Sequence, residues 1–230
     1  MDSSETGLLP GYRAVCKKGI SRVELDGRRL SVRPWMGGGL APFYDAIMEN
    51  SLFPGTFGAS YQVHMATLAA MIGSIHEKRV LELGTGSGSS ALVLPPDNRY
   101  FGVDTSEALL RRAVGKFKRA AHTTCLLFLC SAEDLPFESG SFDAAICNLS
   151  LNFFGSIETA VDETARVLVS GAKLVASVPV PERNGRHATI RGRLLSEHEL
   201  RSLFELRGFA FKPEPVRNGA LLYFSATRTG

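Results

Sequence analysis

A run of three alternating glycines constrains this chain of 230 residues more than any other feature. Residues 80–90, with the sequence VLELGTGSGSS, read as a buried strand that runs into Gly84, Gly86 and Gly88 and then into a helix. Glycine lets a ligand approach the backbone and tolerates positive φ, and the free N–H groups at a helix start attract anionic groups. The pattern predicts a small-ligand site at the end of a buried strand.

Two common nucleotide-binding loops fit these glycines poorly. A mononucleotide phosphate loop ends in Gly-Lys-Ser or Gly-Lys-Thr, whereas Ser89 follows Gly88. The dinucleotide pattern G-x-G-x-x-G places Ser89 where close packing needs Gly or Ala, so an NAD-dependent enzyme is a distant alternative. Glu82 precedes the loop, and Asp104 ends the next predicted strand, where a carboxylate accepts hydrogen bonds from both ribose hydroxyls. The combination favours an adenosine-containing ligand.

From Arg79 onward, short apolar runs alternate with helical patterns, which is typical of a parallel sheet flanked by helices. We predict strands at 79–83, 99–104, 124–130, 142–149 and 172–179, and an antiparallel hairpin of 209–212 and 220–227. Helix caps are expected at Thr105 or Ser106, at Ser156 and at Ser196, and Gly171 is expected to end the second of these helices. The fold class is therefore α/β.

The first 58 residues differ in kind from the rest. Asp26-Gly27 suits a tight turn between strands at 20–25 and 28–32, and 37–39 read as a flexible glycine joint. A short helix around 42–50, a Pro54-Gly55 turn and a longer helix over about 59–75 follow. We predict a cap or lid over residues 1–58 and a ligand-binding domain over residues 59–230.

Four ordered motifs resemble those of class I S-adenosylmethionine-dependent methyltransferases, especially the branch of ubiquinone and menaquinone biosynthesis. They are the acid-Leu-Gly-x-Gly-x-Gly loop at 82–88, Gly-Val-Asp-x-Ser at 102–106, Ala-Glu-x-Leu-Pro-Phe at 132–137 with Ser-Phe-Asp at 141–143, and Glu-x-x-Arg-Val-Leu at 163–168. The resemblance covers roughly residues 61–227. It implies a Rossmann-like, doubly wound sheet of seven strands, S-adenosylmethionine as cofactor and S-adenosylhomocysteine as product.

The resemblance also implies cofactor-binding positions. The methionine part would lie against Glu82 and the loop, the ribose at Asp104, and the adenine at the backbone N–H of Ala132 beside Glu133. The full set is Glu82, Gly84, Thr85, Gly86, Gly88, Asp104, Thr105, Ser131, Ala132, Glu133 and Asn148. Ser131 departs from the family, which often has Asp there to accept from the adenine amino group. The turn at 170–172 reads Ser-Gly-Ala in place of the usual Pro-Gly-Gly.

The chemistry implied is an in-line displacement at an activated methyl group, which the protein supports mainly by positioning and by excluding water. A base is needed only where the acceptor must lose a proton. His64, on the helix before the loop, is the catalytic candidate, with a structural histidine as the alternative. Metal-dependent relatives carry Asp where Asn148 stands, so no metal is expected.

Lid and substrate contacts are expected from two segments. Tyr44 and Tyr61 belong to an aromatic-rich stretch that either packs a small cap or closes over a neutral or aromatic acceptor. Arg183 and Arg186 lie in a basic segment after the fifth predicted strand and would contact an anionic group on the acceptor, or form a solvated loop. The basic residues between Arg111 and Arg119 are interpreted as a solvated helix face.

Composition limits the classes of partner that this chain can be expected to bind. The formal net charge is +3, which is too small for a nucleic-acid footprint unless it is concentrated, so nucleic acid is an improbable partner. The four cysteines show neither CxxC nor zinc spacing, and no apolar run is long enough to span a membrane, so a cytoplasmic location is expected. We predict methylation of a small molecule. An RNA methyltransferase and a non-catalytic cofactor-binding protein are the alternatives.

Overall fold

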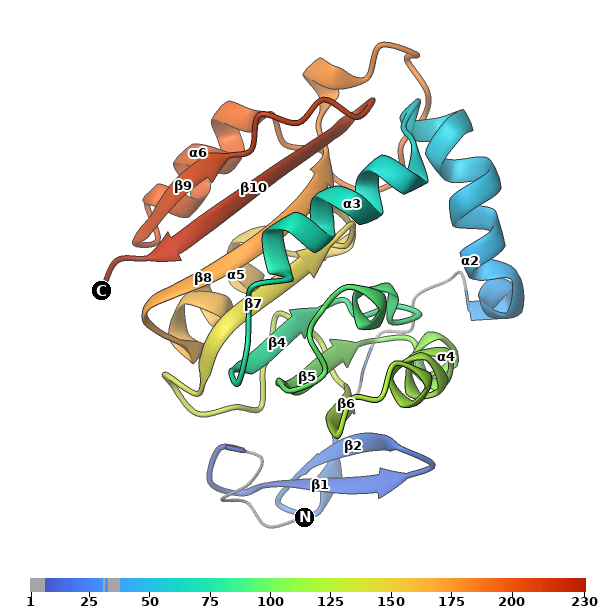
Figure 1. The fold of residues 1–230 in the computed structure, drawn as a ribbon. Helices are drawn as coiled ribbons and strands as arrows, with labels where there is room; N and C mark the ends of the chain where they lie inside the picture. Colours follow the sequence, from blue (N-terminus) through green and yellow to red (C-terminus); the bar gives the residue numbers. More distant parts are fainter. Residues whose placement is uncertain (1–6, 31, 33–37) are drawn as a thin grey trace.

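The computed structural model describes residues 7–30, 32 and 38–230. One twisted sheet runs through the molecule, with helices on both faces and a helical segment over one end (Figure 1). The strands are β1 (Tyr12–Lys17), β2 (Ile20–Leu25), β3 (Arg28–Arg29), β4 (Arg79–Leu83), β5 (Arg99–Asp104), β6 (Thr124–Leu129), β7 (Phe142–Asn148), β8 (Leu168–Pro179), β9 (Phe209–Pro213) and β10 (Leu221–Arg228).

The strand order within the described residues is β1-β2-β6-β5-β4-β7-β8-β10-β9, and β3 pairs with β2. Strands β6, β5, β4, β7 and β8 are parallel, whereas β10 is antiparallel to both β8 and β9. The seven-stranded doubly wound sheet predicted from the sequence is thus present from β6 to β9. The strand order reverses at β4. The loops after β4 and β5 leave the carboxyl ends of their strands, where open α/β sheets bind ligands near such a reversal.

Several of the helices begin at serine caps. The helices are α2 (Tyr44–Ile47), α3 (Tyr61–Ile72), α4 (Glu107–Arg119), α5 (Ile157–Val167) and α6 (Glu197–Glu205). The side chains of Ser106, Ser156 and Ser196 each accept a hydrogen bond from a backbone N–H in the first turn, as predicted. Gly171 does not end α5. Instead, β8 begins at Leu168, because the helix register gives way directly to strand pairing with Phe142 of β7.

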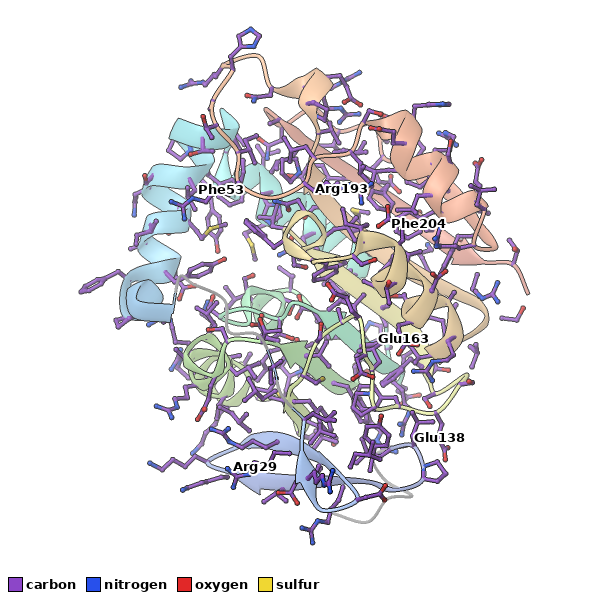
Figure 2. All side chains as sticks on the ribbon, turned by 180° about the vertical axis from the view of Figure 1, so that it is seen from behind. Arg29, Phe53, Glu138, Glu163, Arg193 and Phe204 are labelled. Atoms are coloured by element: carbon purple, nitrogen blue, oxygen red, sulfur yellow. The ribbon has the colours of Figure 1, made fainter. Side chains whose placement is uncertain are left out.

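Two apolar layers hold the helices against the sheet. On one face, α5 and α6 contribute Ala160, Leu200 and Phe204, and Phe204 points toward the sheet from α6 (Figure 2). On the other face, α3 and α4 contribute Leu68 and Phe117. The loop after β4 is not followed by a regular α-helix but by a short 3₁₀ turn, η3 (Ser89–Leu92). Because Pro95 and Pro96 follow so soon, the chain returns to the sheet after one turn.

The N-terminal residues form two separate structures. Strand β2 pairs in parallel with β6, so the hairpin of β1, β2 and β3 extends the main sheet at its edge (Figure 1). The second structure comprises η1 (Gly38–Phe43), α2 and the π-helical η2 (Met48–Phe57). We call residues 38–57 the lid segment. Pro54 and Gly55 lie inside η2 and make no separate turn, and the division of the chain at residue 58 stays a prediction.

Across the described ranges, none of the helices is both long and apolar enough to cross a lipid bilayer.

Candidate cofactor and acceptor site

The glycine loop is shaped by three left-handed residues after β4. Gly84, Gly86 and Gly88 have φ angles of 67°, 56° and 78°. A Cβ on Gly84 would lie 2.4 Å from Ser150 Cβ, and one on Gly88 would lie 2.9 Å from Ala113 Cα, so both positions require glycine for packing as well as for φ. A Cβ on Gly86 would meet nothing closer than a backbone oxygen at 3.9 Å. The loop is therefore packed on its inner side and open beside Gly86.

Asp104 joins the glycine loop to the start of α4. Its Oδ2 accepts a hydrogen bond from the Gly86 N–H at 2.7 Å, and its Oδ1 accepts from the Ser106 N–H at 2.7 Å. Burial raises the pKa of Asp104, and the backbone N–H groups of Ser106, Gly86 and Thr105 act in the opposite direction. The structure thus brings together three of the predicted cofactor positions, Gly86, Asp104 and Thr105.

Glu82 lies beneath the loop and is only 1% exposed. Its Oε2 accepts hydrogen bonds from Ser90 Oγ at 2.5 Å and from the Tyr100 hydroxyl. Burial raises the pKa of Glu82 to about 7, against the effect of these two donors. Thr85 is also buried, and its hydroxyl lies 3.1 Å from Tyr100 Oη. In this structure both side chains support the loop from below, and a direct contact with the cofactor stays a prediction.

The segment after β6 contains the predicted adenine residues. Ser131 Oγ accepts from the Glu133 N–H at 3.2 Å, which makes a local turn, and Ala132 is buried. Glu133 Oε1 accepts from the Ser156 N–H at 3.0 Å, so its carboxylate holds the start of α5. The backbone of this segment is clamped from α5: Glu163 accepts from the Leu135 N–H at 2.9 Å.

A buried polar cluster lies between the end of β7, α3 and β10. His64 is 1% exposed, and its Nδ1 lies 3.1 Å from the Tyr223 hydroxyl. The Ser60 N–H donates to Asn218 Oδ1, which orients the amide so that Nδ2 donates to Tyr223 Oη at 3.0 Å. The tyrosine hydroxyl is thus shared between the Asn218 amide and the His64 imidazole.

The surroundings of His64 keep it neutral. Burial lowers the pKa of His64 to about 4, while a hydrogen bond with Asn148 acts in the opposite direction. Asn148 Oδ1 also accepts from Ser177 Oγ at 2.7 Å. A neutral imidazole that holds Tyr223 and Asn148 in place fits these contacts, and the role of His64 as a base stays a prediction.

The lid segment brings aromatic side chains to the same cluster. The ring of Phe53 lies 5.1 Å from that of Tyr61 and 4.9 Å from that of His64, and Figure 2 shows Phe53 directed from the lid segment toward the sheet. Tyr44, at the start of α2, has its pKa raised to about 12 by burial and by the negative charges of Asp104 and Asp45. Tyr44 is therefore close to Asp104, and Tyr61 is close to His64.

The charged residues that hold the lid segment were missed in the sequence. Asp45 Oδ1 accepts hydrogen bonds from Ser87 Oγ at 2.5 Å and from Lys116 Nζ at 2.8 Å, and its Oδ2 accepts from Arg112 Nη2 at 2.5 Å. The interpretation of the basic α4 residues as a solvated face is thus wrong for Arg112 and Lys116. Their i, i+4 spacing puts both on one helix face, which was the available signal. The partner, Asp45, is distant in sequence.

Arg183 and Arg186 differ in their surroundings. The guanidinium of Arg183 donates to the carbonyls of Leu221 and Val216 and to the carboxylate of Glu197, and its side chain is 8% exposed. Arg186 is exposed, and its side chain lies against Gly58 at the end of the lid segment. Contact with an acceptor is a prediction for both residues, and the surroundings favour Arg186.

The described residues show no cluster of His, Cys, Asp and Glu able to hold a metal ion. Burial raises the pKa of the Cys147 thiol to about 12, so this thiol is not an activated nucleophile.

The glycine loop and Asp104 fit an S-adenosyl cofactor. The open space beside Gly86 leaves room for a ligand at the backbone, and the Asp104 carboxylate next to it is an acceptor of the kind that ribose hydroxyls need. The turn η3 stands in place of a long helix, so the loop N–H groups, rather than a full helix dipole, would attract an anionic group there.

Known proteins agree with this geometry. Residues 81–176 match the family model described as a methyltransferase domain. The demethylmenaquinone methyltransferase of Thermus thermophilus is 33% identical over 140 residues, which make up 59% of this chain and 60% of that protein. The chain thus matches about three fifths of the length of that curated relative.

Two solved structures share the fold. An S-adenosylmethionine-dependent methyltransferase from Thermotoga maritima, titled a possible histamine N-methyltransferase, aligns with a TM-score of 0.61 at 21% identity over 84% of this chain and 100% of that one. The [4+2]-cyclase SpnF aligns with a TM-score of 0.67 at 17% identity over 87% of this chain and 99% of that one. Residues 81–176 therefore match the methyltransferase domain family, and the fold around them is shared with the solved structure of an S-adenosylmethionine-dependent methyltransferase.

Proposed function

We propose that this chain transfers a methyl group from S-adenosylmethionine to a small aromatic acceptor of the quinone class. The observation that carries the proposal is the open face of the loop at Gly86, whose N–H is bonded to the Asp104 carboxylate. The quinone class is supported by the name of the Thermus relative and by two partly buried tyrosines near the glycine loop and His64, Tyr44 and Tyr61. An aromatic wall suits a neutral planar acceptor.

In this proposal, each part of the site has a physical task. The cofactor supplies an electrophilic methyl group, and the chain positions both reactants and excludes water. Asp104 holds the ribose, and the backbone at 84–88 holds the methionine part. The segment at 131–133 lies at the adenine end. Tyr44 and Tyr61 line the acceptor side, and Arg186 is placed for an anionic substituent.

The proton balance of the acceptor decides whether a base is needed. A phenolate or an enolate attacks directly, whereas a neutral phenol must lose its proton at or before methyl transfer. The neutral His64 imidazole is buried and contacts Tyr223 and Asn148, so it would act by holding these two side chains beside the acceptor. This use of His64 is part of the proposal.

The test is transfer of labelled methyl from S-adenosylmethionine to a reduced demethylated quinone, run beside a cell extract separated into small-molecule, RNA and protein fractions. We expect label in the quinone and in the small-molecule fraction, unaffected by nuclease and by a chelator. Nuclease-sensitive label in RNA would replace the proposal with the RNA alternative. Loss of activity in chelator that magnesium restores would reject metal-independent transfer.

A second function is favoured by one observation. The cyclase SpnF has this fold and a name that describes another reaction, so the fold alone does not fix methyl transfer. If the chain binds S-adenosylhomocysteine but labels no fraction, the non-catalytic or cyclase-like alternative gains support, and the methyltransferase proposal fails.

A further inference from the structure

Asp45 joins the lid segment to the glycine loop and to α4, which are distant from it in sequence. Its carboxylate contacts Ser87, which lies between Gly86 and Gly88, and Lys116 on α4. Lys116 Nζ also donates to Ser87 Oγ at 3.1 Å, so the three groups close a ring of contacts. We call Asp45, Ser87 and Lys116 the lid latch.

The lid latch is partly buried, so solvent screens its charge-assisted contacts less than on an open surface. The Lys116 side chain is 13% exposed and that of Asp45 is 34% exposed, and Ser87 is buried. Arg112 adds a second tie to the lid segment, because its Nη1 donates to the Pro42 carbonyl at 2.9 Å while its Nη2 contacts Asp45. The charged donors hold the pKa of Asp45 at about 2 despite its partial burial, so it is ionised at neutral pH.

The lid latch lies beside the proposed cofactor site. Ser87 is next to Gly86, whose N–H is bonded to Asp104, and Tyr44, next to Asp45, is close to that same carboxylate. Two consecutive lid residues therefore face the ribose position and the glycine loop. A ligand held at Asp104 and the loop would therefore lie beside residues of the lid segment.

We propose that Asp45 is a positioning residue that fastens the lid segment to the cofactor loop through Ser87 and Lys116 and so sets how long the cofactor stays bound. The inference rests on the proposed cofactor site. It assigns Asp45 no contact with the reacting atoms. Its effect is on the dissociation rate of the cofactor and of the product, and on the order of the lid segment.

The experiment compares Asp45→Asn with a matched control, Glu49→Gln, which removes a carboxylate from an exposed position of the same segment. S-adenosylhomocysteine is the probe, and its dissociation is followed by chase of labelled ligand. We expect Asp45→Asn to speed dissociation about tenfold or more, as for loss of a charge-assisted contact, and Glu49→Gln to change it less than about twofold. Hydrogen exchange over residues 38–57 should slow on ligand binding in the wild type and much less in Asp45→Asn.

Further variants separate positioning from folding. Lys116→Met and Ser87→Ala remove the other two members of the lid latch, and each should speed dissociation of S-adenosylhomocysteine. In double variants with Asp45→Asn, the combined effect should be smaller than the sum of the single effects, because all three substitutions break the same set of contacts. Asp45→Glu should restore part of the slow dissociation. Unchanged dissociation in folded Asp45→Asn, or full additivity with Lys116→Met, overturns the inference. A wild type that does not bind S-adenosylhomocysteine overturns the proposed cofactor site instead.

Discussion

The Asp104 carboxylate is held by the backbone around it. It is bonded to the N–H groups of Gly86 and Ser106, so its orientation is fixed before a ribose arrives. A fixed acceptor loses little conformational entropy on binding, which strengthens each hydrogen bond to the ligand. Contact with a ribose stays a prediction for this residue.

We therefore expect Asp104→Ala to weaken binding of S-adenosylmethionine by about 1.5 to 3 kcal/mol, the range for hydrogen bonds to a charged partner. Titration calorimetry measures the change, and Glu107→Gln on the first turn of α4 is the control. Equal affinity of wild type and Asp104→Ala would remove the ribose assignment.

Gly86 should be sensitive for a different reason. Valine there meets no protein atom closer than a backbone oxygen at 3.9 Å from its Cβ, so the fold should survive with a cost of about 1 to 2 kcal/mol from the positive φ. The side chain would instead occupy the space that the cofactor needs. We expect loss of cofactor binding with a retained circular dichroism spectrum. Tight binding by folded Gly86→Val would contradict this role.

His64 can be tested by separating catalysis from stability. In its buried, neutral environment, His64→Gln should lower the free energy of unfolding by about 1 to 3 kcal/mol, because Tyr223 loses a partner. We expect kcat to fall less than about tenfold. A loss of about a hundredfold or more in kcat with wild-type stability is the signature of a general base, and it would establish the catalytic prediction.

At the scale of elements, α5 explains why the Glu-x-x-Arg motif accompanies the cofactor motifs. Arg166 donates to the carbonyls of Phe137 and Leu135 at 2.6 and 2.9 Å and pairs with Glu163, which in turn accepts from the Leu135 N–H. The helix thereby fixes the irregular segment that follows β6. The motif thus stabilises the segment that contains the residues proposed to contact adenine.

Arg166→Met should accordingly act on both stability and cofactor affinity. Two buried carbonyls and one carboxylate would lose their donor, so we expect the free energy of unfolding to fall by about 2 to 4 kcal/mol. Affinity for S-adenosylhomocysteine should fall as well, because Ala132 lies in the released segment. Arg193→Met, which removes an exposed pair with Glu158, is the control and should change the stability by less than about 1 kcal/mol. A stable Arg166→Met variant with unchanged affinity would reject the clamp.

At the scale of the molecule, Glu82 links the stability of the fold to pH. Burial raises the pKa of Glu82 to about 7 from its ordinary 4.5, so between these values the folded protein binds a proton that the unfolded chain has released. The stabilisation of the folded state by this bound proton is complete below about pH 4.5, the pKa in the unfolded chain. It is lost as the pH rises through about 7, the pKa in the folded protein.

Glu82→Gln removes this titration and keeps an acceptor for Ser90 and Tyr100. The variant should therefore gain stability relative to wild type between about pH 5 and pH 8, by at most about 3 kcal/mol. Urea unfolding at several pH values measures the difference. A constant difference across this range would show that Glu82 does not titrate there.

Sequence determined the parts of the molecule that local patterns encode. Apolar runs separated by capping serines set the parallel strands and α4, α5 and α6, and the glycine spacing with Asp104 set the cofactor loop, because these features depend on neighbours in the chain. The helix expected after the loop is instead the short 3₁₀ turn η3, because Pro95 and Pro96 follow so soon.

Tertiary structure alone decided the contacts between distant segments. Whether the β1–β3 hairpin would cap the site or extend the sheet depended on the free edge of β6, which no local pattern reports. Likewise, the meeting of Asp45 with Ser87 and Lys116, and of His64 with Tyr223, requires the chain to return across the sheet. Charge and burial at these points are properties of the packed molecule, because a side chain acquires its dielectric surroundings and its partners only when the chain has folded.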